Sequence, residues 1–239
     1  MLRLVECIEA VAFDLDGTLI DTAPDLAAAA NMMLSLLGGR PLPEDCIPAL
    51  IGDGVDSFVA RVLEKSRGRS TLDPALRATA FTLFARLYEQ HLSDRSRIFP
   101  GVVPALEVLE NAGLALCCVT NKESRFAMPL LEAAGLRERF ATTLCGDRPE
   151  DRKPSPNMLL AACRQLGVEP RHLLYIGDSP SDIAAARALK CRVVAVNYGY
   201  SAHQVLAQAR PDCIVGSLTR ITTIGLRPRP AGPELRVVS

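Results

Sequence analysis

The sequence predicts an α/β fold: a parallel sheet covered by helices on both faces, with a helical domain inserted after the first strand. From residue 99 onward, short apolar runs alternate with helical patterns, which is typical of right-handed βαβ units. Between residues 25 and 97, helical patterns follow one another without a strand signal. A chain of 239 residues is long enough for one globular unit with a smaller insertion of this kind.

The first strand is expected at residues 11–13, a short apolar run that ends at Asp14. Asp14 then lies at the carboxyl end of a buried parallel strand, the edge where ligands bind in open α/β sheets. Asp16 follows two residues later, so the two carboxylates project to the same side if the chain stays extended. Gly17 permits a tight turn after them. Taken alone the pair is most often a plain acidic loop, but it also suits acid–base chemistry or metal binding.

The inserted segment contains three helical patterns. They begin at Pro24, after Gly52-Asp53-Gly54, and at Asp73-Pro74, and the first is closed by Gly38 and Gly39. We therefore expect an α-helical cap domain over residues 21–98.

The pattern returns to alternation after Phe99-Pro100-Gly101. Helices are expected at residues 102–112, 123–134, 157–166 and 182–189, and strands at 114–119, 141–144, 173–176 and 192–196. Together with residues 1–20, the segment 99–218 forms a Rossmann-like core. Residues 219–239 are rich in proline and arginine, and we expect a mobile or surface-docked tail without chemistry.

The composition limits the functions available to this chain. Lys and Arg total 27 and balance 27 Asp and Glu, so no global field favours nucleic acid or an anionic membrane. No apolar run approaches the roughly 20 residues of a membrane helix, and the first ten residues lack a secretory pattern. A cytoplasmic protein is expected. The eight scattered cysteines predict reduced thiols, and the oligomeric state, monomer or homodimer, stays open.

Three later stretches place further polar residues at or beyond the ends of expected strands. CCVTNK contributes Thr120 and Asn121, RKPSP contributes Lys153, and YIGDSPSD contributes Asp178 and Asp182. Each alone has an ordinary explanation, such as a helix cap, a surface lysine or a turn residue. Their joint order after the first acidic motif is a much stronger signal.

This set, beginning with DLDGTLIDT, resembles the phosphatase branch of the haloacid dehalogenase (HAD) superfamily. The resemblance implies a small phosphate monoester as substrate, with Asp14 as the nucleophile and Asp16 as the general acid and base. Lys153, Thr120 and Asn121 would bind the phosphate.

A phosphate monoester carries nearly two negative charges and would repel a carboxylate nucleophile, so a cation must intervene. The resemblance implies Mg²⁺ held by Asp14, a main-chain carbonyl at Asp16, and Asp178. Asp182 would support Lys153 or the loop of Asp178, and Gly17 would support the first turn.

Within that superfamily, the chain is most similar to the phosphoglycolate phosphatase group. The similarity rests on IGDGVDSFVARVL, FPGV, VTNKES, RKPSP, GDSPSD and VNYGY. Ser181 and Glu123 depart from that group, where Asn and Pro are common. Because phosphoglycolate carries a carboxylate, a cap cation is expected, and Arg61 is the candidate, although a solvated helix arginine is the commoner explanation.

Several alternatives remain open. A dehalogenase is set aside because the dehalogenases of the superfamily lack the second aspartate of the first motif, which is present here as Asp16. A phosphatase of pyrophosphate or of a sugar phosphate, or a phosphomutase, is not excluded. A non-catalytic binding protein is disfavoured, because it should have lost at least one of the four central residues, Asp14, Asp16, Lys153 and Asp178.

Overall fold

A six-stranded parallel sheet forms the centre of the protein. The computed structural model describes residues 8–68 and 73–223. In spatial order the strands are β5 (Thr142–Cys145), β4 (Ala115–Thr120), β1 (Ala10–Phe13), β6 (Leu173–Gly177), β7 (Arg192–Val196) and β8 (Cys213–Val215), and every neighbouring pair is parallel. The first strand therefore lies between β4 and β6, in the interior of the sheet.

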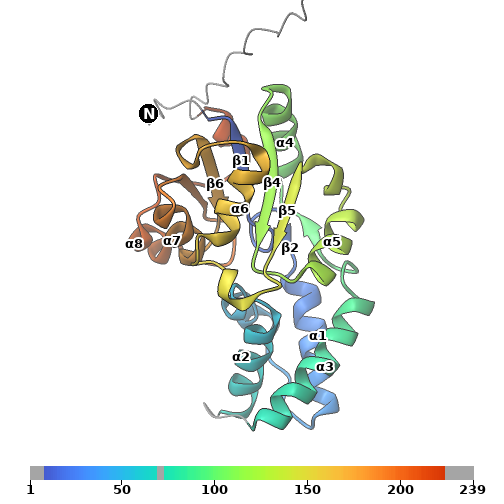
Figure 1. Ribbon diagram of the computed structural model, residues 1–239. Coiled ribbons are helices and arrows are strands. Elements are labelled where there is room, and N and C mark those ends of the chain that lie inside the picture. The colour runs from blue at the N-terminus through green and yellow to red at the C-terminus, as the bar shows by residue number, and fades with distance from the viewer. Residues whose placement is uncertain (1–7, 69–72, 224–239) are drawn as a thin grey trace, which may run out of the picture.

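Helices cover both faces of this sheet (Figure 1). One face carries α4 (Val102–Asn111) and α5 (Ser124–Ala133), and the other carries α6 (Asn157–Leu166), α7 (Pro180–Ala188) and α8 (His203–Ala209). Successive residues of β1 alternate between the two apolar clusters, because side chains of a strand point to opposite faces. Val11 and Phe13 pack toward α4 and α5, and the small Ala10 and Ala12 pack toward the other three helices.

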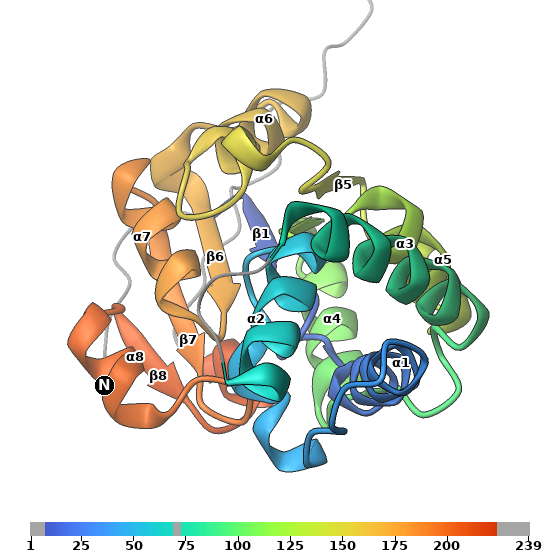
Figure 2. The ribbon, with the colours of Figure 1, turned by 90° about the horizontal axis from the view of Figure 1, so that it is seen from below.

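A helical insert follows the first strand. It contains α1 (Ala23–Leu36), α2 (Val55–Arg67) and α3 (Pro74–Gln90), with two short 3₁₀ helices, η1 (Glu44–Cys46) and η2 (Pro48–Leu50). The chain enters it through β2 (Ile20–Asp21) and leaves it through β3 (Arg97–Ile98), which pair antiparallel. The expected boundaries at residues 20/21 and 98/99 fall on this strand pair. Figures 1 and 2 show the three helices gathered at one end of the sheet.

The predicted fold class is confirmed, and most elements lie within one to three residues of their expected positions. The helix at 157–166 and the strand at 192–196 match the expected limits. Sequence reasoning missed β2, β3 and β8, since strands of two or three residues are too short to show alternation. It also missed α8, a seven-residue helix in which Leu206 is the buried residue, too few for a helical apolar pattern.

Regular structure also continues past residue 218, the expected end of the core. The 3₁₀ helix η6 (Leu218–Thr223) packs on α4, and Ile221 within it is fully buried. The rest of the predicted tail, residues 224–239, lies outside the described residues.

One apolar cluster runs from the α4/α5 face of the sheet into the helical insert. Seven of the eight cysteines lie in the described ranges, and all seven are free thiols, as expected from the sequence. Among the helices that the structure describes, none combines the length and apolar character needed to cross a bilayer.

Two leucines of α1 offer a matched test of this packing. Leu34 is fully buried, whereas Leu36, two residues later, is 65% exposed. We expect Leu34→Ala to lower the free energy of unfolding by about 2–5 kcal/mol, because it leaves a cavity, and Leu36→Ala to change it by less than about 0.5 kcal/mol. Urea denaturation measures both, and equal effects of the two variants would contradict the observed orientation of α1.

Candidate active site

Asp14 leaves the carboxyl end of β1 in the interior of the sheet. Its main-chain N–H donates to Ile176 O of β6 (2.9 Å), and the residue is only 9% exposed. One carboxylate oxygen, Oδ1, lies 2.8 Å from Lys153 Nζ and accepts a hydrogen bond from Leu15 N (2.7 Å). These two donors hold the carboxylate in a defined orientation.

Lys153 reaches this carboxylate from the loop that precedes α6. Its ammonium group also donates to Asp182 Oδ1 (2.7 Å), to the hydroxyl of Tyr175 (2.9 Å) and to Val119 O (3.1 Å). Such a buried cation is stable only because several acceptors surround it.

Asp182 is fully buried at the start of α7, and both of its oxygens are engaged. Oδ1 accepts from Lys153 and from the Tyr175 hydroxyl (2.9 Å), and Oδ2 accepts from the main-chain N–H (3.0 Å) and hydroxyl (2.6 Å) of Ser179. Asp182 therefore holds Lys153 through an ion pair and caps its own helix.

Asp178 follows β6 directly and is 3% exposed. Its carboxylate accepts hydrogen bonds from the Thr18 hydroxyl (3.1 Å) and from Tyr200 N (2.7 Å). Gly17 has a φ of +81°, and any side chain at that position would collide with the Asp178 carboxylate and the Tyr200 ring. The glycine thus supplies both the turn and the space that the Asp178 side chain fills.

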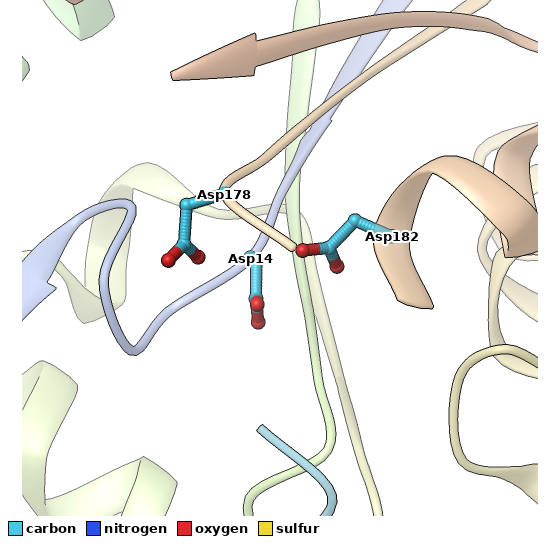
Figure 3. Close-up of side chains that lie close together, drawn as sticks. All are labelled: Asp14, Asp178 and Asp182. Carbon is cyan, nitrogen blue, oxygen red and sulfur yellow. The ribbon is translucent and has the colours of Figure 1, made fainter. Parts of the chain in front are cut away.

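The carboxylates of Asp14, Asp178 and Asp182 form one buried cluster, in which each offers an oxygen within 4.8 Å of the others (Figure 3). Burial and the neighbouring Asp182 raise the pKa of Asp14 to about 7, although Lys153 acts to lower it. Burial, with the charges of Asp182 and Asp14, also raises the pKa of Asp178 well above its usual value.

The cluster holds three carboxylates, and the ammonium group of Lys153 pairs with two of them, Asp14 and Asp182. It therefore carries excess negative charge, which a divalent cation would neutralise. Each carboxylate oxygen of Asp182 already accepts two hydrogen bonds, whereas each oxygen of Asp178 accepts one and the contacts of Asp14 are to Oδ1. Asp14 and Asp178 are therefore the side chains that fit such a cation. An all-oxygen donor set suits Mg²⁺.

Asp16 lies near this cluster but has different partners. Its Oδ1 accepts from the Thr22 hydroxyl (2.5 Å) and from Lys122 Nζ (2.9 Å), and its side chain is 13% exposed. The Lys122 side chain is 2% exposed and lies over the ring of Tyr88 in α3, with Nζ 4.9 Å from the ring centroid. A carboxylate fixed in this way, facing a cavity, is placed to exchange a proton with a bound molecule.

Thr120 and Asn121 end β4 on the other side of Asp14. The Thr120 hydroxyl accepts from Lys122 N (3.1 Å). The Asn121 side chain donates to Lys153 O (3.0 Å) and to Gly52 O of the helical insert (2.9 Å), and it accepts from Lys153 N (2.7 Å). Asn121 therefore uses its side chain to fix the Lys153 loop and one loop of the insert.

A cavity of about 380 Å³ lies between the sheet edge and the insert. Polar residues from the sheet side form its floor: Asp14, Asp16, Thr120, Asn121, Lys122, Asp178 and Ser179. Its opposite wall is largely apolar and includes Leu26, Pro48, Ile51, Val55 and Phe58. This volume is in the range of small-ligand sites. Among the described residues that line the cavity, Lys122 is the one cationic side chain.

The structure does not bring Arg61 into this group. Its guanidinium donates to the Asp53 carboxylate and to Leu50 O (3.1 Å), and the residue is absent from the cavity lining. Arg61 thus braces the loop that precedes α2, in place of the substrate-facing position expected from the sequence.

Sequence reasoning assigned no role to three residues that orient the acidic side chains, although each had a signal. Lys122 follows Thr120 and Asn121 in the VTNK stretch, and Tyr200 ends the VNYGY stretch. Tyr175 is a tyrosine inside a buried central strand, and such a hydroxyl needs a polar partner.

Comparisons with known proteins agree with this geometry. A sequence profile described as haloacid dehalogenase-like hydrolase matches residues 8–190. Phosphoglycolate phosphatase of Thiobacillus denitrificans is 45% identical over 212 residues, covering 88% of this chain and 92% of the relative. The enzyme of the same name from Chromobacterium violaceum is 42% identical over 214 residues, covering 90% and 95%.

The fold is also similar to solved structures. A crystal structure described as a predicted phosphoglycolate phosphatase from Haemophilus somnus 129pt has a TM-score of 0.85 and 32% identity, covering 91% of this chain and 97% of that chain.

The raised pKa of Asp14 predicts a pH-dependent stability when divalent cations are removed. The folded protein holds a proton on Asp14 up to about pH 7, whereas the unfolded chain loses it near 3.8. The stabilising contribution of this residue is therefore complete below pH 3.8 and is lost as the pH rises toward about 7. The loss is at most about 1.4 kcal/mol per pH unit.

Urea denaturation in chelator, across this pH range, compares the wild type with Asp14→Asn. The stability difference between the two proteins should shift in favour of the asparagine variant as the pH rises. A difference independent of pH would contradict the burial of an ionisable Asp14 in this cluster.

Proposed function

The chain belongs to the haloacid dehalogenase-like hydrolases, and from this membership we propose that it hydrolyses 2-phosphoglycolate to glycolate and phosphate. The observation that carries the proposal is the ion pair between Asp14 and Lys153, next to Asp178 at the floor of a small cavity. Relatives 42–45% identical over about nine-tenths of the chain bear the name phosphoglycolate phosphatase, which supports the substrate.

The reaction follows from the positions of the two aspartates. A carboxylate oxygen of Asp14 attacks phosphorus, the bond from phosphorus to the glycolate oxygen breaks, and Asp16 donates its proton to that oxygen. Asp16 then takes a proton from water as the water oxygen attacks phosphorus. The bond to Asp14 breaks, phosphate leaves, and Asp16 is protonated again for the next cycle. Thr22 and Lys122 hold Asp16 in place for both transfers.

The other residues stabilise the charge on the transferring group. Lys153 supplies positive charge beside Asp14, and the Thr120 hydroxyl and the main-chain N–H of Asn121 donate to the phosphate oxygens. When bound, Mg²⁺ on Asp14, Asp178 and the main-chain oxygen of Asp16 would neutralise charge between nucleophile and phosphate. Use of Mg²⁺ and a cytoplasmic location belong to the same proposal.

Lys122 is the candidate for the substrate carboxylate. Lys122 lines the cavity, and its ion pair with Asp16 holds the ammonium group beside the acid–base residue. The glycolate end of the substrate must lie there too, because Asp16 protonates the glycolate oxygen. Burial acts to lower the pKa of Lys122, but Asp16 and Tyr88 outweigh this and raise it, so the side chain stays charged.

Phosphate release from a substrate panel tests the proposed reaction. The panel contains phosphoglycolate, a sugar phosphate, pyrophosphate and an aryl phosphate, each with Mg²⁺ and with chelator. We expect phosphoglycolate to have the highest kcat/KM, chelator to abolish the activity, and Asp14→Asn to lower kcat by roughly a thousandfold or more through loss of the nucleophile.

Asp94→Asn is the matched control, because Asp94 is an exposed aspartate of the insert whose carboxylate pairs with His91, away from the cavity lining. It should retain wild-type activity. Preference for another substrate would keep the mechanism and remove the phosphoglycolate assignment, and absence of hydrolysis of any substrate would contradict both.

Substitution of Lys122 tests the carboxylate contact. Lys122→Met should raise the KM for phosphoglycolate about tenfold or more relative to the aryl phosphate, because only phosphoglycolate loses a charge-assisted hydrogen bond. The kcat should fall for both substrates, since Asp16 loses a partner. Arg61→Met serves as the comparison and should shift the KM values of the two substrates equally. An equal KM change for both substrates in Lys122→Met would remove Lys122 from this role.

A further inference from the structure

Arg152, the residue before Lys153, joins the sheet side of the cavity to the helical insert. On the sheet side its Nε donates to Gly146 O (2.7 Å), and its Nη2 lies 3.0 Å from Glu123 Oε1. On the insert side its Nη1 donates to Asp53 O (3.3 Å) and pairs with the Asp56 carboxylate in the first turn of α2. The side chain is 9% exposed, so one nearly buried guanidinium bridges both halves of the protein.

Residues 52–54 and the first two residues of α2, together named loop 52–56 here, pack directly against this guanidinium. Gly54 has a φ of +89°, and any side chain there would collide with Arg152. The neighbouring Gly52 carbonyl accepts from the Asn121 side chain (2.9 Å), a second link from the sheet edge to the same loop. The loop is therefore docked by two side chains that flank the catalytic positions Thr120 and Lys153.

The same loop forms one wall of the reaction cavity. Gly52, Gly54 and Val55 line it, together with Ile51 and Phe58 on either side. Because Arg152 contacts the loop and is absent from the cavity lining, its position sets the position of this wall without contact to a bound molecule.

The charges around Arg152 explain why an arginine is needed. Two carboxylates, Asp56 and Glu123, converge on it from the insert and from the sheet side, and Glu123 Oε2 is buried without a hydrogen-bond partner in the described part of the chain. A planar guanidinium donates in several directions at once, whereas a lysine ammonium acts as a single point charge on a flexible stem.

We propose that Arg152 is a positioning residue for the phosphatase reaction, which holds loop 52–56 against the sheet edge through Asp56, Glu123 and Gly146. It acts through the loop that closes the cavity over the substrate, and Lys153, the next residue, acts at the phosphate. The choice of substrate in the test rests on the proposed function.

The experiment compares Arg152→Met, Arg152→Lys and Asp56→Asn with the wild type in the full-length protein. Arg148→Met is the matched control, because Arg148 is an exposed arginine of the same segment. Two readouts are used: kcat and KM with phosphoglycolate and an aryl phosphate, and hydrogen exchange of peptides covering residues 50–60 without substrate. Thermal melting identifies any variant that fails to fold, in which case the two milder variants decide the outcome.

We expect Arg152→Met to raise KM by about tenfold to a hundredfold with a smaller fall in kcat, and to speed exchange at residues 50–60 while peptides of β1 and β6 stay protected. Arg152→Lys should restore only part of the loss, and Asp56→Asn should act in the same direction. The double variant Arg152→Met with Asp56→Asn should be no worse than Arg152→Met alone, because both act on one contact. Arg148→Met should match the wild type.

The proposal would be overturned if Arg152→Met left both the KM and the hydrogen exchange of residues 50–60 unchanged. A fall in kcat without a change in hydrogen exchange would also overturn it, because that result would place Arg152 at the phosphate. The exchange readout needs no substrate, so it decides on Arg152 even if the wild type proves inactive on phosphoglycolate. Failure of the proposed function is visible separately, as absence of phosphoglycolate hydrolysis by the wild type.

Discussion

The buried ammonium of Lys153, shared between Asp14 and Asp182, is the interaction on which the site depends. Burial alone acts to lower the pKa of Lys153, but the two carboxylates outweigh that effect and raise it, so the side chain stays charged. Removal of either carboxylate would leave a buried charge with fewer partners, which is strongly unfavourable. Asp14, Lys153 and the first residues of α7 are therefore held by one electrostatic arrangement.

The topology of the sheet explains why these residues meet. After β1 the chain adds β4 and β5 on one side, and then returns to add β6, β7 and β8 on the other. A crevice opens at such a switch point, outside the carboxyl ends of the strands. Asp14 follows β1, Thr120 ends β4 and Asp178 follows β6, so three sequence-distant polar residues line one crevice without any need for long loops.

The helical insert completes the site by adding an apolar wall opposite the polar floor. Apolar walls exclude water and strengthen the interactions of the charged groups below them. The wall can cover the floor only if the insert is docked on the sheet edge. The docking contacts come from side chains beside Thr120 and Lys153, namely Asn121 and Arg152. Two cavity-floor residues and a residue paired with Asp14 thus share two short segments of chain with the side chains that place the wall.

The sequence by itself determined the fold class, the three helices of the insert, and the positions of Asp14, Asp16, Lys153 and Asp178. Most of these features are local: apolar periodicity predicts each element, and the aspartates are predicted as polar residues at strand ends. Lys153 lies in the loop before α6, and the order of the motifs along the chain singled it out.

Only the tertiary structure decided which side chains meet across the chain. Lys122 pairs with Asp16 over 106 positions, Arg152 reaches Asp56 over 96, and Arg61 lies away from the cavity that its helix helps to line. Such pairings depend on how the insert packs against the sheet edge, and no local pattern encodes that packing. The short strands β2 and β8 were also decided by tertiary structure, through pairing with β3 and β7, since a strand of two or three residues is defined by its partner strand rather than by its own sequence.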